Sequence, residues 1–391
     1  MAVPKKYTLI LSCLLLVCLG IVLAEVLSYA IISHFTNVEE GHPYHPYLGW
    51  VARPNSDIKL TGHCPGQELS ASCGIIKTDE NGHSITPFFQ GEPDMTIVVL
   101  GGSTMFGAGA SSNGTTVPSL LEETINRHTS KKVEVVNLGV CGYQSFQEML
   151  ALHRYLRDHP ADLVLAVTGR NDAESGLDFP AKEAAFLPES VHFKAALMRH
   201  FEDRDGGVAM TLQHVRLILN SYSYTFKLFE KALHYIRIKT TTGEGEVLDE
   251  AGKSSDPFAN IDQRVGITSL HYDMMQTITN AHGAEFIMFL QPTAFTKPIL
   301  TDEEQICAAS RVVGDQRIDN GLLREYEKRY FAQLRTVGKK YQFADITHVF
   351  DGESRTVYKD MCHYNDIGAK VVAEAIYAKY KDLWKTEQCR N

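Results

Sequence analysis

The chain has 391 residues, of which 44% are hydrophobic, so it can bury one large core or two moderate ones and is not a disordered protein. Its formal net charge is −9, and it contains no block rich in Lys and Arg. These features argue against nucleic acid as a partner, because phosphate binding requires clustered positive charge. They favour an uncharged or weakly charged substrate.

Residues 1–35 are predicted to direct the chain to a membrane. Lys5 and Lys6 precede the uncharged stretch 7–24, whose length of roughly eighteen residues is near the lower limit for a membrane-spanning helix. We favour a retained anchor, because the apolar stretch is longer than that of a typical signal peptide; the alternative is a signal peptide cleaved near Ala24. In both cases the lysines stay in the cytoplasm and the rest is exported. We therefore expect a single-pass protein with a periplasmic or extracellular domain, or a secreted protein if the segment is cleaved.

An exported domain lies in an oxidising compartment, where cysteines form disulfides. Cys64 and Cys73 flank a short loop that contains Gly, Pro and Ser, and we predict that they pair. The pairing of four further cysteines is left open by the sequence: Cys141, Cys307, Cys362 and Cys389. No Cys-x-x-Cys pair occurs to suggest zinc, and we expect neither a metal nor a cofactor.

Residues 36–94 are predicted to be an extracytoplasmic lead-in with short strands. The segment is rich in Gly, Pro, His and Asn, and its stretches 48–55 and 75–87 have the pattern of extended pieces around turns. His42 and His45 are separated by Pro43 in a loop-like sequence, which favours a loop over a metal pair.

From residue 95 to residue 391 the pattern alternates between buried strands and amphipathic helices. Strands are predicted at 95–100, 133–138, 162–168, 285–290 and 343–346, and helices at 117–128, 145–159, 266–281 and 366–384. Such alternation implies right-handed crossovers and a parallel sheet covered by helices on both faces. The sequence thus predicts one doubly wound α/β domain.

An insertion at about 173–265 interrupts this alternation. It is expected to be mainly helical, at 193–200 and 215–238, with a Gly-rich and Ser-rich stretch at 240–258. Because it follows the carboxyl end of a strand, the insertion is either a lid over the functional edge or a packing or partner surface.

Polar residues follow the ends of the predicted strands. Ser103 comes directly after Gly101 and Gly102, a loop containing Gly142 follows the second strand, and Asn171 follows the third. Asp360 and His363 stand three residues apart near the C-terminus, so both can reach one site from a single turn. The carboxyl edge of a parallel sheet is where ligands bind.

These residue types are the ones that acyl transfer requires. Ser103 would be the nucleophile, His363 its base, and Asp360 the group that orients the imidazole. The backbone N–H groups of Ser103 and Gly142 and the side-chain amide of Asn171 would surround the developing oxyanion.

This set of residues resembles the SGNH/GDSL hydrolase superfamily over roughly 95–380. The matching positions are Ser103 in the first block, Gly142 in the second, Asn171 in the Gly-x-Asn-Asp block, and Asp360 with His363 in the Asp-x-x-His block. The first block departs from the pattern, with Gly102 in place of aspartate and Thr104 in place of leucine. The lead-in, with its Leu-Gly-Trp, is similar to membrane-anchored members.

The resemblance implies a flavodoxin-like, five-stranded parallel sheet and a serine esterase that works through an acyl-enzyme on Ser103. Expected substrates are carboxylic esters, acetyl or short acyl, on an extracytoplasmic glycan such as an acylated polysaccharide or on a small molecule. The alternative is an O-acyltransferase that moves the acyl group to a carbohydrate hydroxyl with the same triad. A non-catalytic scaffold is disfavoured, because the serine, asparagine, aspartate and histidine are all intact.

Overall fold

The computed structural model describes residues 19–28, 43–45, 47–59, 74–178, 223, 225–226, 228–229, 256–313 and 316–381. The chain divides into two units, one made of residues 1–39 and 189–246 and the other of residues 40–188 and 247–391. The predicted pair Cys64 and Cys73 lies outside the described residues, as do the predicted helix 193–200 and most of 215–238. Cys141 and Cys362 are free, whereas Cys307 is disulfide-bonded.

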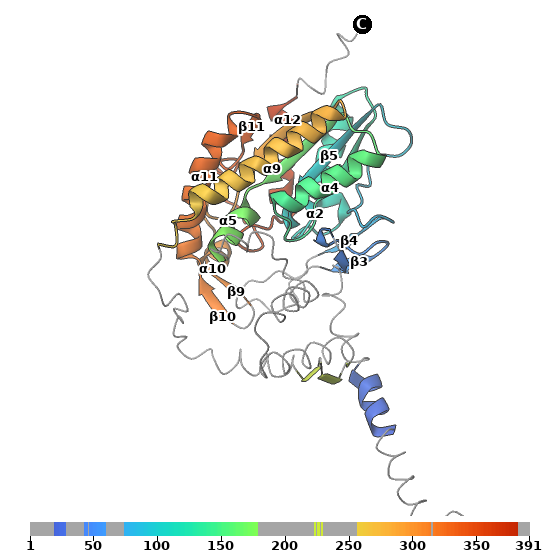
Figure 1. Cartoon of the computed structure of the whole chain (residues 1–391), viewed down its shortest axis with the longest axis vertical. Helices are drawn as coiled ribbons and strands as arrows, with labels where there is room; N and C mark the ends of the chain where they lie inside the picture. Colours follow the sequence, from blue (N-terminus) through green and yellow to red (C-terminus); the bar gives the residue numbers. More distant parts are fainter. Residues whose placement is uncertain are drawn as a thin grey trace, which may run out of the picture. The chain divides into compact units, whose positions relative to one another are not determined.

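The larger unit is built on a parallel sheet of five strands in the order β11-β8-β7-β5-β6 (Figure 1). Its strands are β5 (Met95–Gly101), β6 (Val133–Asn137), β7 (Leu163–Thr168), β8 (Glu285–Leu290) and β11 (Gln342–Asp345). Numbered along the chain, this is the flavodoxin-like order 2-1-3-4-5. The predicted α/β fold with a five-stranded parallel sheet is therefore confirmed.

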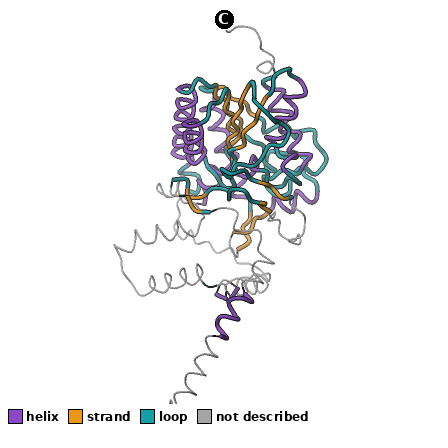
Figure 2. The backbone as a smooth tube through the Cα atoms, turned by 90° about the vertical axis from the view of Figure 1, so that its right-hand side faces the viewer, coloured by secondary structure: helices purple, strands orange, loops and turns teal. Residues whose placement is uncertain are grey.

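Helices cover both faces of the sheet because the strands are apolar on both sides (Figure 2). In β5, Ile97 and Val99 pack on one face, and Val98 and Leu100 pack on the other. The first face is covered by α3 (Val117–His128) and α12 (Asp366–Lys379), and the second by α4 (Ser145–Asp158), α9 (Ile261–Ala281) and α11 (Gly321–Gly338). Each such aliphatic side chain contributes about 1.5–3 kcal/mol by leaving water.

Several elements were not predicted. They are α2 (Ser103–Phe106), α5 (Arg170–Asp178), α10 (Asp302–Ala309), α11, and a hairpin of β9 (Ser310–Val313) and β10 (Gln316–Asp319). The buried side chains of α11 recur at helical spacing, at Leu323, Tyr326, Tyr330 and Leu334. The helix α9 begins at Ile261, five residues before the predicted start, and so buries Ile261 and Val265 as well.

The lead-in forms two antiparallel pairs. One joins β1 (Tyr44–His45) to β2 (Gly49–Trp50), and the other joins β3 (Asp57–Lys59) to β4 (Ile75–Lys77). The first pair places Trp50 in a small apolar cluster with Val140 and Tyr143, which belong to the loop after β6.

Of the predicted membrane segment, the structure describes residues 19–28, which are helical. Among all the described residues, none of the helices has the length and hydrophobicity that crossing a membrane requires. Glu25, which interrupts the apolar segment, accepts hydrogen bonds from the Ser223 hydroxyl (2.5 Å) and the Thr225 backbone N–H (3.3 Å). Both contacts lie within the smaller unit, and they supply two hydrogen-bond donors to the Glu25 carboxylate.

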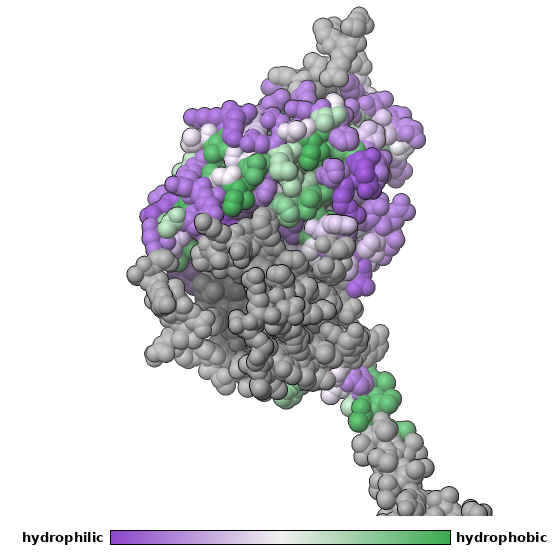
Figure 3. Space-filling view, viewed as in Figure 1, coloured by the Kyte–Doolittle hydropathy of each residue, from purple (hydrophilic) through white to green (hydrophobic). Residues whose placement is uncertain are grey.

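The visible surface of the larger unit is mostly hydrophilic, with apolar side chains along its middle over α9 and α4 (Figure 3). On α9, Leu270 is 56% exposed and Met274 is 43% exposed, four residues apart on one side of the helix.

Glu122 of α3 is a fully buried carboxylate that ties the lead-in to the sheet. One of its oxygens accepts hydrogen bonds from the backbone N–H groups of Phe88 and Phe89, and the other accepts one from Val135 in β6. Three backbone N–H groups from two main-chain segments thus share this carboxylate.

We expect Glu122→Ala to lower the free energy of unfolding by about 3 kcal/mol or more, because each buried N–H left without an acceptor costs about 1–3 kcal/mol. Thermal unfolding of the full-length protein measures the loss. The matched control is Glu123→Ala, whose side chain is 25% exposed and pairs only with Arg127 on the surface. Equal melting temperatures for the two variants would contradict the structural role of Glu122.

Candidate active site

Ser103 stands at the carboxyl edge of the sheet because β5 ends in two glycines. A Cβ atom on Gly101 would lie 2.8 Å from the carbonyl oxygen of Val167, and a Cβ on Gly102 would lie 2.3 Å from the Nδ2 atom of Asn171. Both approaches are too close for any other residue. The turn therefore brings Ser103, the first residue of α2, beside the end of β7, where the strand order of the sheet reverses.

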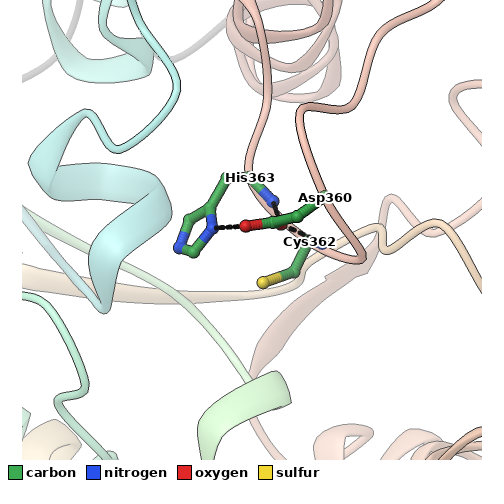
Figure 4. A group of neighbouring side chains, drawn as sticks. All are labelled: Asp360, Cys362 and His363. Atoms are coloured by element: carbon green, nitrogen blue, oxygen red, sulfur yellow. Dashed lines mark hydrogen bonds and ion pairs between the residues drawn. The ribbon is translucent and has the colours of Figure 1, made fainter. Parts of the chain in front are cut away.

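A chain of hydrogen bonds links Ser103 to the loop between β11 and α12. The Ser103 hydroxyl lies 2.6 Å from Nε2 of His363, and Nδ1 of His363 lies 2.5 Å from Oδ2 of Asp360. The other oxygen of Asp360 accepts hydrogen bonds from the backbone N–H groups of Cys362 and His363, both at 2.9 Å. The structure thus brings together the three residues predicted to form the triad, and Figure 4 shows the aspartate and histidine.

The charges of this pair stabilise each other. Burial by itself raises the pKa of Asp360, but the charge of His363 and the hydrogen bonds from the imidazole and the backbone outweigh burial, so the pKa lies well below its usual range. Burial lowers the pKa of His363, but the Asp360 charge and the nearby Cys362 thiol raise it more, to well above 6.5. Asp360 is therefore a carboxylate that holds a proton on Nδ1 of His363.

Two of the predicted oxyanion donors are held by neighbouring loops: the Asn171 amide lies against Gly102, and Gly142 lies in the loop after β6. Asn171 donates one N–H of its amide to the carbonyl oxygen of Tyr143 (2.8 Å), which fixes the amide and leaves its second N–H for a ligand. Gly142 has a φ of +77°, a conformation that favours glycine. Within the described part of the chain, the backbone N–H groups of Ser103 and Gly142 have no acceptor.

The Gly142 loop is braced by Trp50 of the lead-in, a contact that the sequence analysis missed. The indole N–H of Trp50 donates to the carbonyl oxygen of Cys141 (2.8 Å), and the Tyr143 hydroxyl donates to the carbonyl oxygen of Trp50 (2.7 Å). The two rings meet edge to face, with centroids 5.8 Å apart. These contacts hold the Cys141 carbonyl and the Tyr143 side chain, on the two sides of Gly142.

A buried ion pair next to Asn171 was also missed. The guanidinium of Arg170 lies 3.1 Å from the carboxylates of Glu327 and Glu174, and its Nη2 atom lies 3.1 Å from the sulfur of Met361, the residue after Asp360. Burial raises the pKa of Glu327 to about 7, although Arg170 and a hydrogen bond from the Thr293 hydroxyl oppose the rise. In the sequence, this ion pair is indicated only by the position of Arg170 in the Gly-x-Asn-Asp block, next to Asn171.

A second serine, histidine and aspartate meet behind the site. The Ser145 hydroxyl lies 2.6 Å from the Asp172 carboxylate and 2.8 Å from Nδ1 of His271. Here both partners contact the serine, and Ser145 is fully buried. This cluster joins the N-terminal ends of α4 and α5. Because its serine is fully buried, a substrate cannot reach the hydroxyl.

No family model matches the chain, and no curated protein matches it. Among solved structures, the acetyl xylan esterase AlAXEase aligns at 11% identity and a TM-score of 0.37, covering 73% of this chain and 100% of that one. TesA aligns at 12% identity and a TM-score of 0.39, covering 74% and 99%. A catalytic mutant of the acetylxylan esterase Axe2 from Geobacillus stearothermophilus aligns at 10% identity and a TM-score of 0.38. The alignment covers 77% of this chain and 100% of that one.

The pKa of His363 can be measured without any substrate. We expect ¹⁵N NMR of labelled histidine to show that His363 titrates above 6.5 in the wild-type protein. In Asp360→Asn the pKa of His363 should fall, because the Asp360 charge that raises it is lost while burial, which disfavours the imidazolium, remains. An unchanged pKa for His363 in Asp360→Asn would contradict the pairing.

Proposed function

We propose that the protein is a serine esterase that hydrolyses carboxylic esters through an acyl-enzyme on Ser103. The observation that carries this proposal is the continuous hydrogen-bonded chain from Ser103 through His363 to Asp360 at the carboxyl edge of the sheet. The Asn171 amide lies against Gly102, the residue before Ser103, and this supports its proposed role as an oxyanion donor.

In the proposed mechanism, neutral His363 accepts the Ser103 proton at Nε2 while the Ser103 oxygen attacks the ester carbonyl. Asp360 keeps the other imidazole proton on Nδ1 and stabilises the imidazolium. The N–H groups of Ser103, Gly142 and Asn171 stabilise the tetrahedral oxyanion. His363 then protonates the leaving alcohol, and water attacks the acyl-enzyme by the same route.

The substrates that we propose are acetyl or short acyl esters on a glycan or a small molecule outside the cytoplasm. Outside the N-terminal segment, the sequence has no long apolar stretch of the kind that would receive a long acyl chain. Measuring rates on p-nitrophenyl esters of increasing chain length tests the acyl preference. Adding sugar acceptors and analysing the products separates hydrolysis from acyl transfer to a carbohydrate hydroxyl.

Ser103→Ala and His363→Ala should each lower kcat/KM for p-nitrophenyl acetate by roughly 10⁴-fold or more, and the double variant should be scarcely slower, because triad members act as a unit. Asn171→Ala should lose about 10²- to 10³-fold, since the backbone donors remain. The matched control is Ser111→Ala, which removes an exposed serine hydroxyl that contacts Asp366.

A fluorophosphonate probe should label Ser103 and leave Ser103→Ala unlabelled. Wild-type activity in Ser103→Ala, or labelling that maps to Ser111, Ser112 or Ser145, would overturn the assignment. Thermal unfolding of each variant verifies that lost activity does not reflect lost folding.

We further propose that residues 1–35 anchor the protein in a membrane with its catalytic unit outside the cytoplasm. The support is the sequence: Lys5 and Lys6 precede the apolar stretch, and no comparable basic cluster follows it.

A reporter enzyme fused after Asn391 that works only outside the cytoplasm should therefore be active. The matched control is a fusion that lacks residues 1–35, which should be inactive. Activity of a cytoplasm-only reporter at the same fusion point would contradict the proposed orientation.

A further inference from the structure

The loop that carries Asp360 and His363 also carries a thiol that the proposed mechanism does not use. Cys362 lies between Met361 and His363, is free, and is only 8% exposed. A carboxylate oxygen of Asp360, the sulfur of Cys362 and a ring nitrogen of His363 all lie within 4.8 Å of one another. Figure 4 shows the three side chains leaving the loop toward the same side.

We propose that this cluster is an inhibitory site for a thiophilic divalent cation of the zinc class. Asp360, Cys362 and His363 supply one oxygen, one sulfur and one nitrogen, and a fourth position stays open. The effect on catalysis rests on the esterase function proposed above, whereas binding of the metal does not.

The donor set selects the metal. A thiolate with an imidazole suits Zn²⁺ and similar borderline cations, whereas Mg²⁺ and Ca²⁺ prefer oxygen ligands alone. In a tetrahedral zinc site the ligand atoms are about 3.3–3.8 Å apart, as follows from bond lengths near 2.0–2.3 Å. The Nδ1 atom of His363 and the Oδ2 atom of Asp360, now 2.5 Å apart, would have to separate by about 1 Å, and the sulfur lies within 4.8 Å of a ligand atom of each residue.

The loop is well suited to chelation. All three donors come from four consecutive residues, so little chain entropy is lost when a metal joins them. The second oxygen of Asp360 stays bound to the backbone N–H groups of Cys362 and His363, which keeps the carboxylate in place while its first oxygen binds metal. Arg170, the nearby cation, is already paired with Glu327 and Glu174, which limits its repulsion of a metal.

Metal binding would remove the base. In the metal-free site the imidazole proton is on Nδ1, and Nε2 faces Ser103 as an acceptor. A metal at Nδ1 takes the position of that proton, so a neutral imidazole must carry its proton on Nε2. A protonated Nε2 can no longer accept the proton of Ser103. Cys362 binds as a thiolate and releases one proton to solvent, so the balance is one metal bound and one proton released.

Binding is tested with Co²⁺ as a spectroscopic probe on the full-length protein. We expect a thiolate-to-cobalt absorption band in the near ultraviolet, saturating at one equivalent and abolished by added Zn²⁺. Ser103→Ala should show the same band, because Ser103 is no ligand. Cys362→Ser and Cys362→Ala should lack the band. The matched control Cys141→Ser should keep it, since Cys141 is the other free cysteine among the described residues but lies outside the cluster.

Inhibition is tested with Zn²⁺ on p-nitrophenyl acetate hydrolysis. We expect Zn²⁺ to inhibit the wild-type protein and EDTA to restore its activity. Relative to each variant's own uninhibited rate, the Zn²⁺ concentration for half inhibition should rise at least tenfold in Cys362→Ser and Cys362→Ala, and stay unchanged in Cys141→Ser. Thermal unfolding confirms that the variants are folded.

The two experiments separate the two proposals. A cobalt band that depends on Cys362 in a protein without esterase activity would support the metal site and contradict the esterase. Absence of the band in the folded wild-type protein, or an equally strong band in both Cys362 variants, would overturn the metal site. Zinc inhibition equal in all variants would also overturn it.

Discussion

The candidate site depends on a carboxylate that is buried and yet ionised, that of Asp360. Removing a charge from water costs several kcal/mol unless hydrogen bonds replace the lost solvation. Here the replacement is local, since two backbone N–H groups and one imidazole come from residues 362 and 363 of the same loop. The loop is held to the rest of the unit through the carbonyl oxygen of Met361, which accepts a hydrogen bond from the backbone N–H of Ala294 (2.9 Å). A short loop thus fixes the imidazole, and one main-chain contact helps to set its distance from Ser103.

The opposite wall of the site is held by contacts from distant parts of the chain. Trp50 fixes the carbonyl oxygen before Gly142, and Arg170 fixes the start of α5, which carries Asn171. Arg170 also reaches Met361, so one buried side chain touches both the oxyanion side and the base side. Buried ion pairs of this kind add little to stability compared with apolar packing, but they penalise any arrangement in which a charge loses its partner. We infer that the ion pair of Arg170 and Glu327 serves mainly to hold the oxyanion side and the base side of the site in fixed positions relative to each other.

Much of the fold followed from local patterns. The helix at 117–128 and the strand at 285–290 have the predicted bounds, because each is a periodic apolar run bounded by polar or turn residues. The resemblance to the four-block family pattern, together with the rule that ligands bind at the carboxyl edge of a parallel sheet, predicted that Ser103 and His363, 260 residues apart, would meet. Trp50 and Glu327 could not be predicted, since their roles exist only once distant segments pack together. The assignments of nucleophile, base and oxyanion donors remain predictions that the geometry supports.

The contact between Gly102 and Asn171 has an evolutionary consequence. An aspartate at position 102 would place its Cβ 2.3 Å from the Nδ2 atom of Asn171, so the Gly-Asp-Ser-Leu form of this block fits this chain only if the Asn171 side chain or the turn shifts. Related chains with aspartate at position 102 keep the asparagine, so they accommodate this shift, whereas glycine at position 102 lets the Asn171 amide of this chain lie directly against the turn before Ser103.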